Sequence, residues 1–487
     1  MPLTLLLIGD LHYGRQNPAC PLPEDAIGEL TAEWLGRALQ EAARHATPDA
    51  IMLTGDLVND GNAAEAEQRL GDLAGVFDEA DAPVIVCPGN HDPDPETTVA
   101  AFGDRFGAHR VGEYILYTFR DVFREDETWI RPAAEIECFL SECAGTPVIA
   151  LQHGPVYPEI PDATYPYVAA NADAILASYD RADVLLSVSG HFHKGREPVK
   201  RNATAYMICT AFCRAPFPYY VVTANGSDIS VARHELAMPE ASRLWDGHTH
   251  SHFGYCAQDV HPRLSLERAD RLGLAGITCV EHAGQVYLSP DEFWRAEHIN
   301  RPKVLRRARR KGRDRMEAFR RELTEHRSPR LRIGLEAEID RDGNLTLLEE
   351  DAEGWDVILG AVHWLPSRFP DRTANERERA FLWCVEKMLD HGIHVLAHPF
   401  RILSRTERPH PAELYPLVAG MLADAGAAAE LNCHANNPNP EFFRACAEAG
   451  TRIVLGSDAH SLYEVGDLHP HLRILRSIGL SPDDVGV

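Results

Sequence analysis

The chain of 487 residues lacks the features that mark several large classes of protein. No apolar run approaches the ~18 residues that a membrane-spanning helix needs, so we expect no membrane span. The opening segment MPLTLLLIGDLH has no basic leader and no small-residue cleavage site, and we interpret it as a buried strand rather than a signal peptide. The 11 cysteines are scattered and form no CxxC pair, which indicates reduced thiols in a cytoplasmic protein.

Positive charge is also scarce, with 48 Lys and Arg against 73 Asp and Glu and a formal net charge of −25. A surface of this sign repels polyanions, so nucleic acid is an unlikely partner. The exception is residues 301–332, which hold 14 basic and 4 acidic side chains. Apolar residues recur there at near-helical spacing. The stretch predicts a solvated amphipathic helix, or alternatively a phosphate-attracting rim or a contact for the acidic first half.

The length and the patterning predict an α/β protein of two domains, residues 1–236 and 244–487, joined by a linker at 237–243. In the first half, strands predicted at 3–8, 50–53 and 83–87 alternate with helices predicted at 29–44 and 64–77. Residues 203–236 read as strand after strand, with Asn225-Gly226 as a hairpin signal. A second run of strand–helix units begins at residue 245, which is typical of a sheet covered by helices.

Five polar clusters follow apolar runs in the first half: GDLH at 9–12, GD at 55–56, GNHD at 89–92, QHG at 152–154 and GHFH at 190–193. Strand ends of this kind meet at one edge of an open α/β sheet, where sites form. Carboxylate, amide and imidazole donors together suit a transition metal such as Mn, Fe or Zn.

This series resembles the calcineurin-like metallophosphoesterases, most closely their bacterial cyclic-nucleotide phosphodiesterase branch. Pro88 stands where the protein-phosphatase branch usually has Arg. The resemblance covers residues 1–236 and implies an αββα sandwich with a two-metal site. It implies a first metal on Asp10, His12, Asp56 and His193, and a second on Asp56, Asn90, His153 and His191. His91 is then placed to donate a proton to the leaving oxygen, with Asp92 either fixing its tautomer or capping the following turn.

Seven apolar runs of the second half also end in possible metal ligands: His248 and His250, His282, Glu336 and Glu338, His363, His398, Glu430 and Asn432, and Asp458 and His460. Strand–helix repetition with polar residues at every strand end predicts a barrel with its site at the C-terminal face. The count is seven strands.

The string HxH, EH, GxE, VH, AHP, GSDAH resembles the polymerase-and-histidinol-phosphatase (PHP) family over residues 244–487. That family implies a distorted (β/α)7 barrel with a metal-dependent phosphoesterase site. By resemblance His248, His250, Glu336 and Asp458 bind one metal, Glu336 bridges to a second on His363 and His398, and His282 with His460 binds a third. Where relatives often supply a further ligand, this chain offers His252, Cys256, Asp259 or none. A buried, inert Cys256 is the preferred interpretation, whereas a thiolate would favour zinc.

These resemblances predict a bifunctional metal-dependent phosphoesterase, with an N-terminal phosphodiesterase and a C-terminal phosphomonoesterase that act on small phosphate esters. Sequential action of the two sites is one form of this hypothesis. Two metals are expected in the first site and two or three in the second. The alternatives are a nucleic-acid-processing nuclease or phosphatase, and an enzyme in which one domain is a regulatory ligand sensor.

Overall fold

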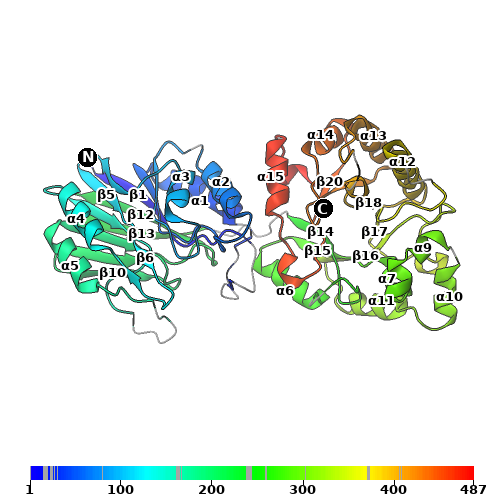
Figure 1. Ribbon diagram of the computed structural model, residues 1–487, viewed down its shortest axis with the longest axis horizontal. Coiled ribbons are helices and arrows are strands. Elements are labelled where there is room, and N and C mark those ends of the chain that lie inside the picture. The colour runs from blue at the N-terminus through cyan, green and yellow to red at the C-terminus, as the bar shows by residue number, and fades with distance from the viewer. Residues whose placement is uncertain are drawn as a thin grey trace. The chain divides into compact units, whose positions relative to one another are not determined.

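The computed structural model describes residues 2–14, 20–21, 26, 28–29, 31–78, 80–160, 165, 167–236, 244–257, 260–301, 303–369, 373–404, 406 and 408–486. The chain divides into two compact units, Met1–Met238 and Pro239–Val487 (Figure 1). The linker predicted at 237–243 lies outside the described residues. Within the described residues, no helix combines the length and the apolarity needed to cross a membrane.

The first unit mixes strands and helices up to β9, with β4 to β7 following one another directly, and then continues as strands only. Its elements are β1 (Leu3–Ile8), α1 (Thr31–His45), β2 (Ala50–Leu53), α2 (Ala66–Val76), β3 (Val84–Val86), α3 (Pro95–Ala101), β4 (Gly107–Val111), β5 (Tyr114–Thr118), β6 (Val122–Phe123), β7 (Trp129–Ile130), α4 (Ala133–Glu142), β8 (Val148–Leu151), α5 (Ala172–Arg181), β9 (Val184–Ser189), β10 (Arg196–Arg201), β11 (Thr204–Ile208), β12 (Pro218–Asn225) and β13 (Asp228–Glu235). The predicted hairpin is confirmed, because Asn225 pairs with Asp228 across the β12–β13 turn and Gly226 has a φ of +60°.

Two sheets form the core of this unit, with strand orders β13-β12-β1-β2-β3 and β10-β11-β9-β8-β5-β4. Period-two alternation sends Leu3, Leu5 and Leu7 of β1 into one cluster with residues of β5, β8 and β9 from the other sheet. The opposite face of the second sheet packs on residues of α4 and α5. Helices α1–α3 accompany the first sheet and α4 and α5 the second, which gives helix, sheet, sheet and helix layers (Figure 1).

A buried guanidinium ties the end of β8 to its surroundings. Arg131 is fully buried and donates to both carboxylate oxygens of Asp121 at 2.8 Å, to the hydroxyl of Tyr179 at 2.8 Å and to Oε1 of Gln152 at 3.0 Å. It also lies over the ring of Phe119, at 3.3 Å from the ring centroid. Gln152 directly precedes one of the candidate ligands, so this network sets the course of the chain at that strand end.

The second unit repeats strand and helix throughout. Its elements are β14 (Trp245–Thr249), α6 (Pro262–Arg271), β15 (Gly276–Cys279), α7 (Ala283–Tyr287), α8 (Pro290–Trp294), α9 (Glu297–Asn300), α10 (Val304–Arg310), α11 (Met316–Glu325), β16 (Leu331–Ala337), η1 (Glu349–Asp351), β17 (Val357–Gly360), α12 (Ala374–Asp390), β18 (Val395–Leu396), η2 (Arg401–Leu403), η3 (Ala412–Leu414), α13 (Tyr415–Ala425), β19 (Ala428–Asn432), α14 (Pro440–Ala449), β20 (Ile453–Gly456), η4 (Leu462–Glu464), α15 (His469–Ser477) and η5 (Pro482–Asp484).

Strands β14 to β20 form one parallel sheet in sequence order, seven strands in the described residues, as the sequence predicts. The sheet curls until its first and last strands meet. The backbone N–H of Asp458 donates to His248 O at 2.8 Å, and that of His250 donates to Ala459 O at 3.0 Å. The result is a nearly closed parallel barrel, whose carboxyl-end edge gathers the polar residues that follow each strand.

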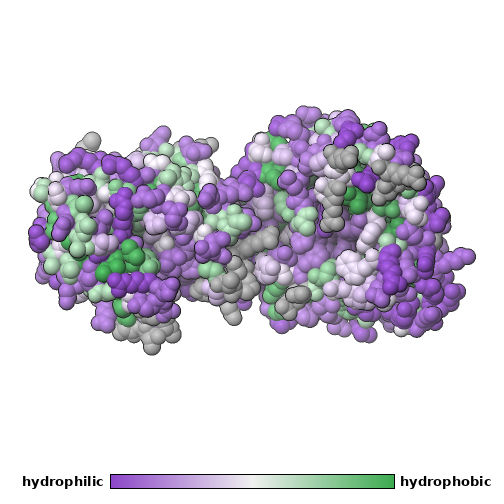
Figure 2. All heavy atoms as spheres, in the orientation of Figure 1, coloured by the Kyte–Doolittle hydropathy of each residue, from purple (hydrophilic) through white to green (hydrophobic). Residues whose placement is uncertain are grey.

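The basic stretch forms α10, α11 and their flanks. The apolar residues at near-helical spacing, Val304, Leu305, Ala308, Met316, Phe319 and Leu323, are all buried. Several guanidinium groups pair with acids of the same unit, among them Arg307 with Glu292 at 3.3 Å and Arg309 with Asp351 at 2.6 Å. The visible surface around these helices is hydrophilic (Figure 2). The amphipathic-helix prediction therefore fits, with much of the basic charge balanced inside the unit.

Replacing Arg131 by Met should destabilise the first unit by about 3–5 kcal/mol, because it leaves the Asp121 carboxylate buried without its counter-charge. Hydrogen exchange followed by mass spectrometry on peptides covering β8 measures this in the intact chain. The exposed Arg124→Met is the matched control and should leave exchange unchanged. Equal protection of β8 in wild type and Arg131→Met would contradict the assignment.

Candidate metal centres

The polar residues of the first unit stand where the sequence predicts, at the ends of five strands. Asp10 and His12 follow β1, Asp56 follows β2, Asn90 follows β3, His153 follows β8, and His191 and His193 follow β9. Asp10, His12, Asp56 and His191 have φ between +42° and +65°, a left-handed backbone that non-glycine residues rarely adopt. Such strain, on the order of 1–3 kcal/mol per residue, persists where the fold holds a side chain toward a site.

Glycine permits the close approach of these strand ends at two positions. A Cβ on Gly89 would lie 2.1 Å from Asp56 Oδ1, and one on Gly190 would lie 2.7 Å from Asp10 Oδ2. Any larger residue would push the carboxylates away from the centre, which explains why glycine accompanies the polar residues in these motifs.

Two overlapping groups of donor atoms result, each with its atoms within 4.8 Å of one another: Asp10, His12, Asp56 and His193, and Asp56, His153 and His191. His12 Nε2 lies 3.0 Å from His193 Nε2, and His153 Nε2 lies 3.2 Å from both Asp56 Oδ2 and Asn90 Oδ1. Ligands at 2.0–2.2 Å from one tetrahedral ion are about 3.4 Å apart, so these separations fit metal ligation. Asp56 belongs to both groups.

The protonation of this centre also suits a metal. His153 Nδ1–H donates to the carbonyl of Thr54 at 2.6 Å, so Nε2 faces Asp56 Oδ2 at 3.2 Å, and the Asp56 carboxylate raises the pKa of His153 to about 9 despite its burial. Burial lowers the pKa of His12 and of His191 well below the usual range and that of His193 to about 4, so these rings are neutral donors. Asp10 Oδ2 is buried and has no hydrogen-bond partner among the described residues. The residues therefore fit two cations that share Asp56.

His91 lies beside this centre. Its Nδ1–H donates to the carbonyl of Asn59 at 2.9 Å, and its ring is 4.8 Å from that of His12. Burial opposes a positive charge, but the Asp56 carboxylate outweighs it and raises the pKa of His91 to about 10. The ring is then a charged acid with a transferable proton.

The predicted pairing of Asp92 with the His91 ring is not what the structure shows. The Asp92 carboxylate instead accepts the backbone N–H groups of Leu57 at 2.7 Å, Val58 at 3.0 Å and Gly89 at 2.8 Å. It therefore joins the turns after β2 and β3, and the Asn59 carbonyl sets the His91 tautomer. The alternative role, in ordering a turn, is nearer to the observed one.

Sequence reasoning missed the aromatic side chains around this centre. Phe123 lies with its ring centroid 5.5 Å from those of both His153 and His191, and Tyr167 lies 4.2 Å from His191. These residues sit on β6 and on a loop with no motif, so no sequence signal marked them.

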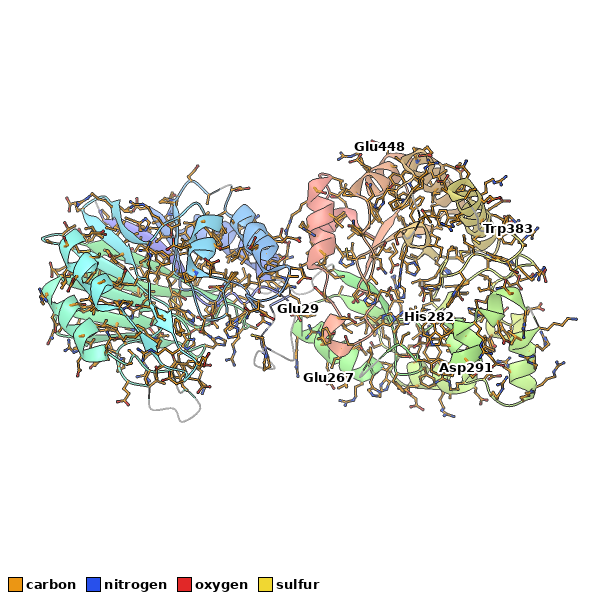
Figure 3. All side chains as sticks on the ribbon, viewed as in Figure 1. Glu29, Glu267, His282, Asp291, Trp383 and Glu448 are labelled. Carbon is orange, nitrogen blue, oxygen red and sulfur yellow. The ribbon has the colours of Figure 1, made fainter. Side chains whose placement is uncertain are left out.

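In the second unit, Glu336 lies at the middle of a ring of imidazoles. Glu336 Oε2 is 2.6 Å from His282 Nδ1 and 3.9 Å from His248 Nε2, whereas Oε1 is 3.0 Å from His398 Nε2 and 3.6 Å from His363 Nε2. Burial opposes its ionisation, yet His282 and His363 hold the pKa of Glu336 well below its usual range. His282 lies inside the unit, while Glu267, Asp291 and Glu448 lie at its periphery (Figure 3).

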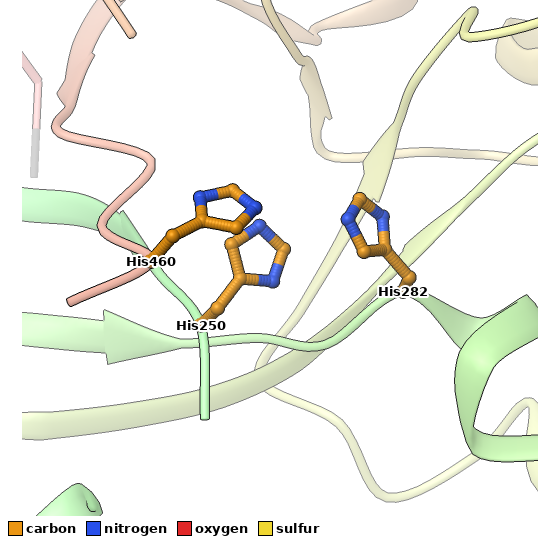
Figure 4. Close-up of side chains that lie close together, drawn as sticks. All are labelled: His250, His282 and His460. Carbon is orange, nitrogen blue, oxygen red and sulfur yellow. The ribbon is translucent and has the colours of Figure 1, made fainter. Parts of the chain in front are cut away.

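Asp458 and His460, two further predicted ligands, also lie in this cluster. Asp458 Oδ1 is 2.9 Å from His250 Nε2 and 3.5 Å from His248 Nε2. His250, His282 and His460 form a second group of donor atoms within 4.8 Å of one another, and their rings converge in Figure 4. All the ligands predicted for the second unit thus lie together. His398 and Asp458 have left-handed backbones, like four residues of the first centre.

Outer carboxylates orient these rings. Glu430 accepts Nδ1–H of His248 at 2.7 Å, Glu281 that of His250 at 3.2 Å and Glu338 that of His363 at 3.1 Å. The sequence indicates a supporting role for Glu338 and Glu430, and it gives no signal for Glu281. Each contact leaves the Nε2 atom facing inward, the arrangement that metal-binding histidines use. Buried His248 Nε2 has no hydrogen-bond partner among the described residues, which fits a cation.

The three candidates for a further metal ligand after the His248–His250 pair differ in their surroundings. His252 Nε2 lies 3.4 Å from Glu322 Oε2 and its ring packs on His261, so it turns away. Asp259 lies outside the described residues. Burial opposes ionisation of Cys256, but hydrogen bonds with His282 and His460 prevail and lower the pKa of the thiol to about 5. The inert-cysteine interpretation therefore does not fit these contacts.

Comparisons with known proteins identify the kind of domain in the first unit. Residues 3–195 match the family described as calcineurin-like phosphoesterase, so this unit carries a calcineurin-like phosphoesterase domain. Two curated relatives are an uncharacterized protein of Schizosaccharomyces pombe, 30% identical over 93 residues, and a probable phosphatase of Shewanella piezotolerans, 25% identical over 158 residues. Those alignments cover 18% and 30% of this chain, and 18% and 58% of the relatives, less than two thirds of either.

Solved structures resemble about half of the chain. A dimetal phosphatase from Danio rerio is 15% identical, with a TM-score of 0.38, and the match covers 48% of this chain and 99% of that one. A Thermus thermophilus protein is 15% identical with a TM-score of 0.34, covering 49% of this chain and all of that one.

Replacing Glu430 by Gln should lower the metal affinity of the second unit about 10–100-fold, because His248 loses the carboxylate that orients it and makes it a stronger donor. Competition with a chelator, read out by metal content, measures this. Glu448→Gln changes an exposed acid of the same unit and is the matched control. Unaltered metal retention in Glu430→Gln would show that the carboxylate does not support a ligand.

Proposed function

We propose that this chain is a phosphoester hydrolase with two metal-dependent active sites, an N-terminal phosphodiesterase and a C-terminal phosphomonoesterase of the PHP type. The observation that carries the proposal is the pair of buried carboxylates, Asp56 and Glu336, each shared by several neutral or carboxylate-oriented imidazoles. Small phosphate esters, nucleotides and cyclic or sugar phosphates among them, are the proposed substrates.

In the first site, Asp10, His12, Asp56 and His193 would hold one divalent cation, and Asp56, Asn90, His153 and His191 the other. Bound Mn, Fe or Zn ions supply charge for the phosphoryl oxygens and lower the pKa of a water molecule. His91 supplies the proton: its Nδ1–H is engaged by Asn59, so Nε2–H is the one available to the leaving oxygen. Asp92 keeps the β2 and β3 turns in register and takes no part in proton transfer.

The aromatic side chains beside the first site favour a substrate with a flat leaving group. Phe123 and Tyr167 flank His153 and His191. A nucleobase or another aromatic ring could stack on them, which adds ~1–3 kcal/mol per base in proteins that bind single strands. This supports nucleotide diesters over diesters of small alcohols in the first site.

In the second site, His248, His250, Glu336 and Asp458 would hold one cation, and Glu336, His363 and His398 a second. Arg401, which the sequence did not single out as a site residue, donates from Nη1 to Asp458 Oδ2 at 3.0 Å and remains partly exposed, at 25%. Its other donors are available to a phosphate dianion, and a bidentate guanidinium contact suits the three terminal oxygens of a monoester. That chemistry supports monoesterase activity in this unit.

Asp56→Asn should abolish diesterase activity and spare monoesterase activity, and Glu336→Gln should do the reverse, because each change removes the shared carboxylate of one centre only. The assay is a metal-loaded screen of phosphodiesters and phosphomonoesters on wild type and both variants. Loss of both activities from one substitution would overturn the assignment of one activity to each site. Full activity of the second unit with its centre emptied of metal would instead favour a sensor role.

His91→Asn should slow the hydrolysis of diesters with poor alcohol leaving groups about 10²–10⁴-fold, because the leaving alkoxide then departs without a proton. Diesters of nitrophenol need no such help and should lose far less. The ratio of kcat/KM for the two substrates gives the answer. Asn is chosen over Ala or Leu at position 91 because its amide can still donate to the Asn59 carbonyl. An equal loss of kcat/KM for both kinds of diester would argue that His91 has a structural role.

A further inference from the structure

The second unit contains a cavity of about 520 Å³ between α10 and the segment that follows β16. Pockets that hold small molecules have volumes of this order. Helices α9 and α10, which contribute to its wall, lie side by side at the edge of the unit (Figure 1). None of the residues that line the cavity is a predicted ligand of either metal centre. The cavity is therefore a place in the fold that the proposed hydrolytic sites do not use.

Three cationic side chains line this cavity from one helix face. Lys303 directly precedes α10, and Arg306 and Arg310 follow it at spacings of three and four residues, which brings all three to the same side. All three are exposed. Arg306 lies 3.4 Å from Glu350, whereas Lys303 and Arg310 have no ion-pair partner in the part of the chain that the structure describes. Unlike the paired Arg309 on the same helix, these cations are available to an anion.

The other lining residues decide what kind of anion fits. Two carboxylates, Asp340 and Glu349, are outnumbered by the three cations. The Asp340 carboxylate is also engaged elsewhere, since its Oδ1 accepts the backbone N–H groups of Asp342 at 2.8 Å and Asn344 at 2.9 Å. Residues 345–348 add three leucines to the wall. The lining thus suits a ligand that joins a negatively charged group to an apolar body.

A buried imidazole also forms part of the wall. His298 is 1% exposed, and its buried Nδ1 has no hydrogen-bond partner within the described ranges. Buried ring nitrogens are normally paired, so an unpaired one in a cavity wall indicates a ligand or water there. His298 Nε2 lies 3.3 Å from Glu338 Oε2, and Thr346, another wall residue, donates to the same oxygen at 3.2 Å. The wall therefore contacts the carboxylate that orients His363.

We propose that this cavity binds a phosphorylated small molecule, with its phosphate on Lys303, Arg306 and Arg310 and its apolar body against the leucines of 345–348. Guanidinium groups form charge-assisted, often bidentate hydrogen bonds with phosphate, and an ammonium adds a point charge beside them. The inference goes beyond the proposed function, because binding here requires neither metal nor hydrolysis.

Pyridoxal 5′-phosphate is a suitable probe, since it carries a phosphate, an aromatic ring and an aldehyde. The aldehyde condenses with a lysine amine to an imine and releases water, and borohydride then reduces the imine to a stable secondary amine. In the metal-loaded full chain, Lys303 should be labelled about tenfold faster than Lys311, an exposed lysine that ends the same helix outside the cavity. Peptide mass spectrometry measures both positions.

Pyridoxal, which lacks the phosphate, is the matched control reagent and should label Lys303 and Lys311 alike. Equal labelling of the two lysines by the phosphorylated probe would overturn the inference. So would the same preference for Lys303 with pyridoxal, because the phosphate would then contribute nothing to binding.

Protection by a competing ligand tests both parts of the site. Phenylphosphonate, whose carbon–phosphorus bond a phosphoesterase does not cleave, should protect Lys303 from the probe. Arg310→Gln should raise the concentration needed about tenfold, because it removes one charge-assisted contact with the anion. Arg321→Gln changes an exposed arginine of α11 outside the cavity and should leave protection unaltered. Unchanged protection in Arg310→Gln contradicts the phosphate position, and equal protection by inorganic phosphate contradicts the apolar one.

Discussion

Everything at the two centres depends on burying one carboxylate among imidazoles. Asp56 and Glu336 are each 1% exposed, and removing a carboxylate from water costs several kcal/mol unless opposite charge replaces the solvent. Some of the surrounding rings, such as His12 and His191, are neutral donors, whereas Asp56 raises the pKa of His153 to about 9 despite its burial. The carboxylates of Glu430 and Asp458 raise the pKa of His248 to about 9 despite its burial, and the same field would favour a divalent cation.

The backbone conformation at the two centres is strained and closely packed. Six of the site residues, Asp10, His12, Asp56, His191, His398 and Asp458, have left-handed backbones, and Gly89 and Gly190 are needed because the neighbouring carboxylates approach too closely for a Cβ. Strain of this kind is destabilising on its own and persists only where surrounding contacts over-determine it. Networks such as that of Arg131, which fixes the residue before His153, provide those contacts.

The sequence predicted those features of the two centres that depend only on where the strands end. Asp10, Asp56, His153, Glu336 and Asp458 follow apolar runs, and parallel strands bring such residues to one edge, so their convergence needed no knowledge of side-chain geometry. Hydrogen-bond partners were harder, because they join residues far apart in the chain. Asp92 is adjacent to His91 in sequence but turns to the backbone of Leu57 and Val58, and Glu281, after β15, reaches His250 at the end of the neighbouring β14. Spacing alone carries no information on such contacts.

The two centres fix their rings by different means, and this separates their chemistry. Thr54 and Asn59 hold His153 and His91 through backbone carbonyls, which are neutral dipoles. Glu281, Glu338 and Glu430 hold three rings of the second centre through full negative charges, whereas a fourth, His460, donates to the backbone carbonyl of Asp458. A carboxylate behind an imidazole raises the basicity of its inward nitrogen more than a carbonyl does, so these three rings are the stronger donors. The first centre instead places His91 beside its rings, and the Asp56 carboxylate raises the pKa of His91 to about 10 despite its burial.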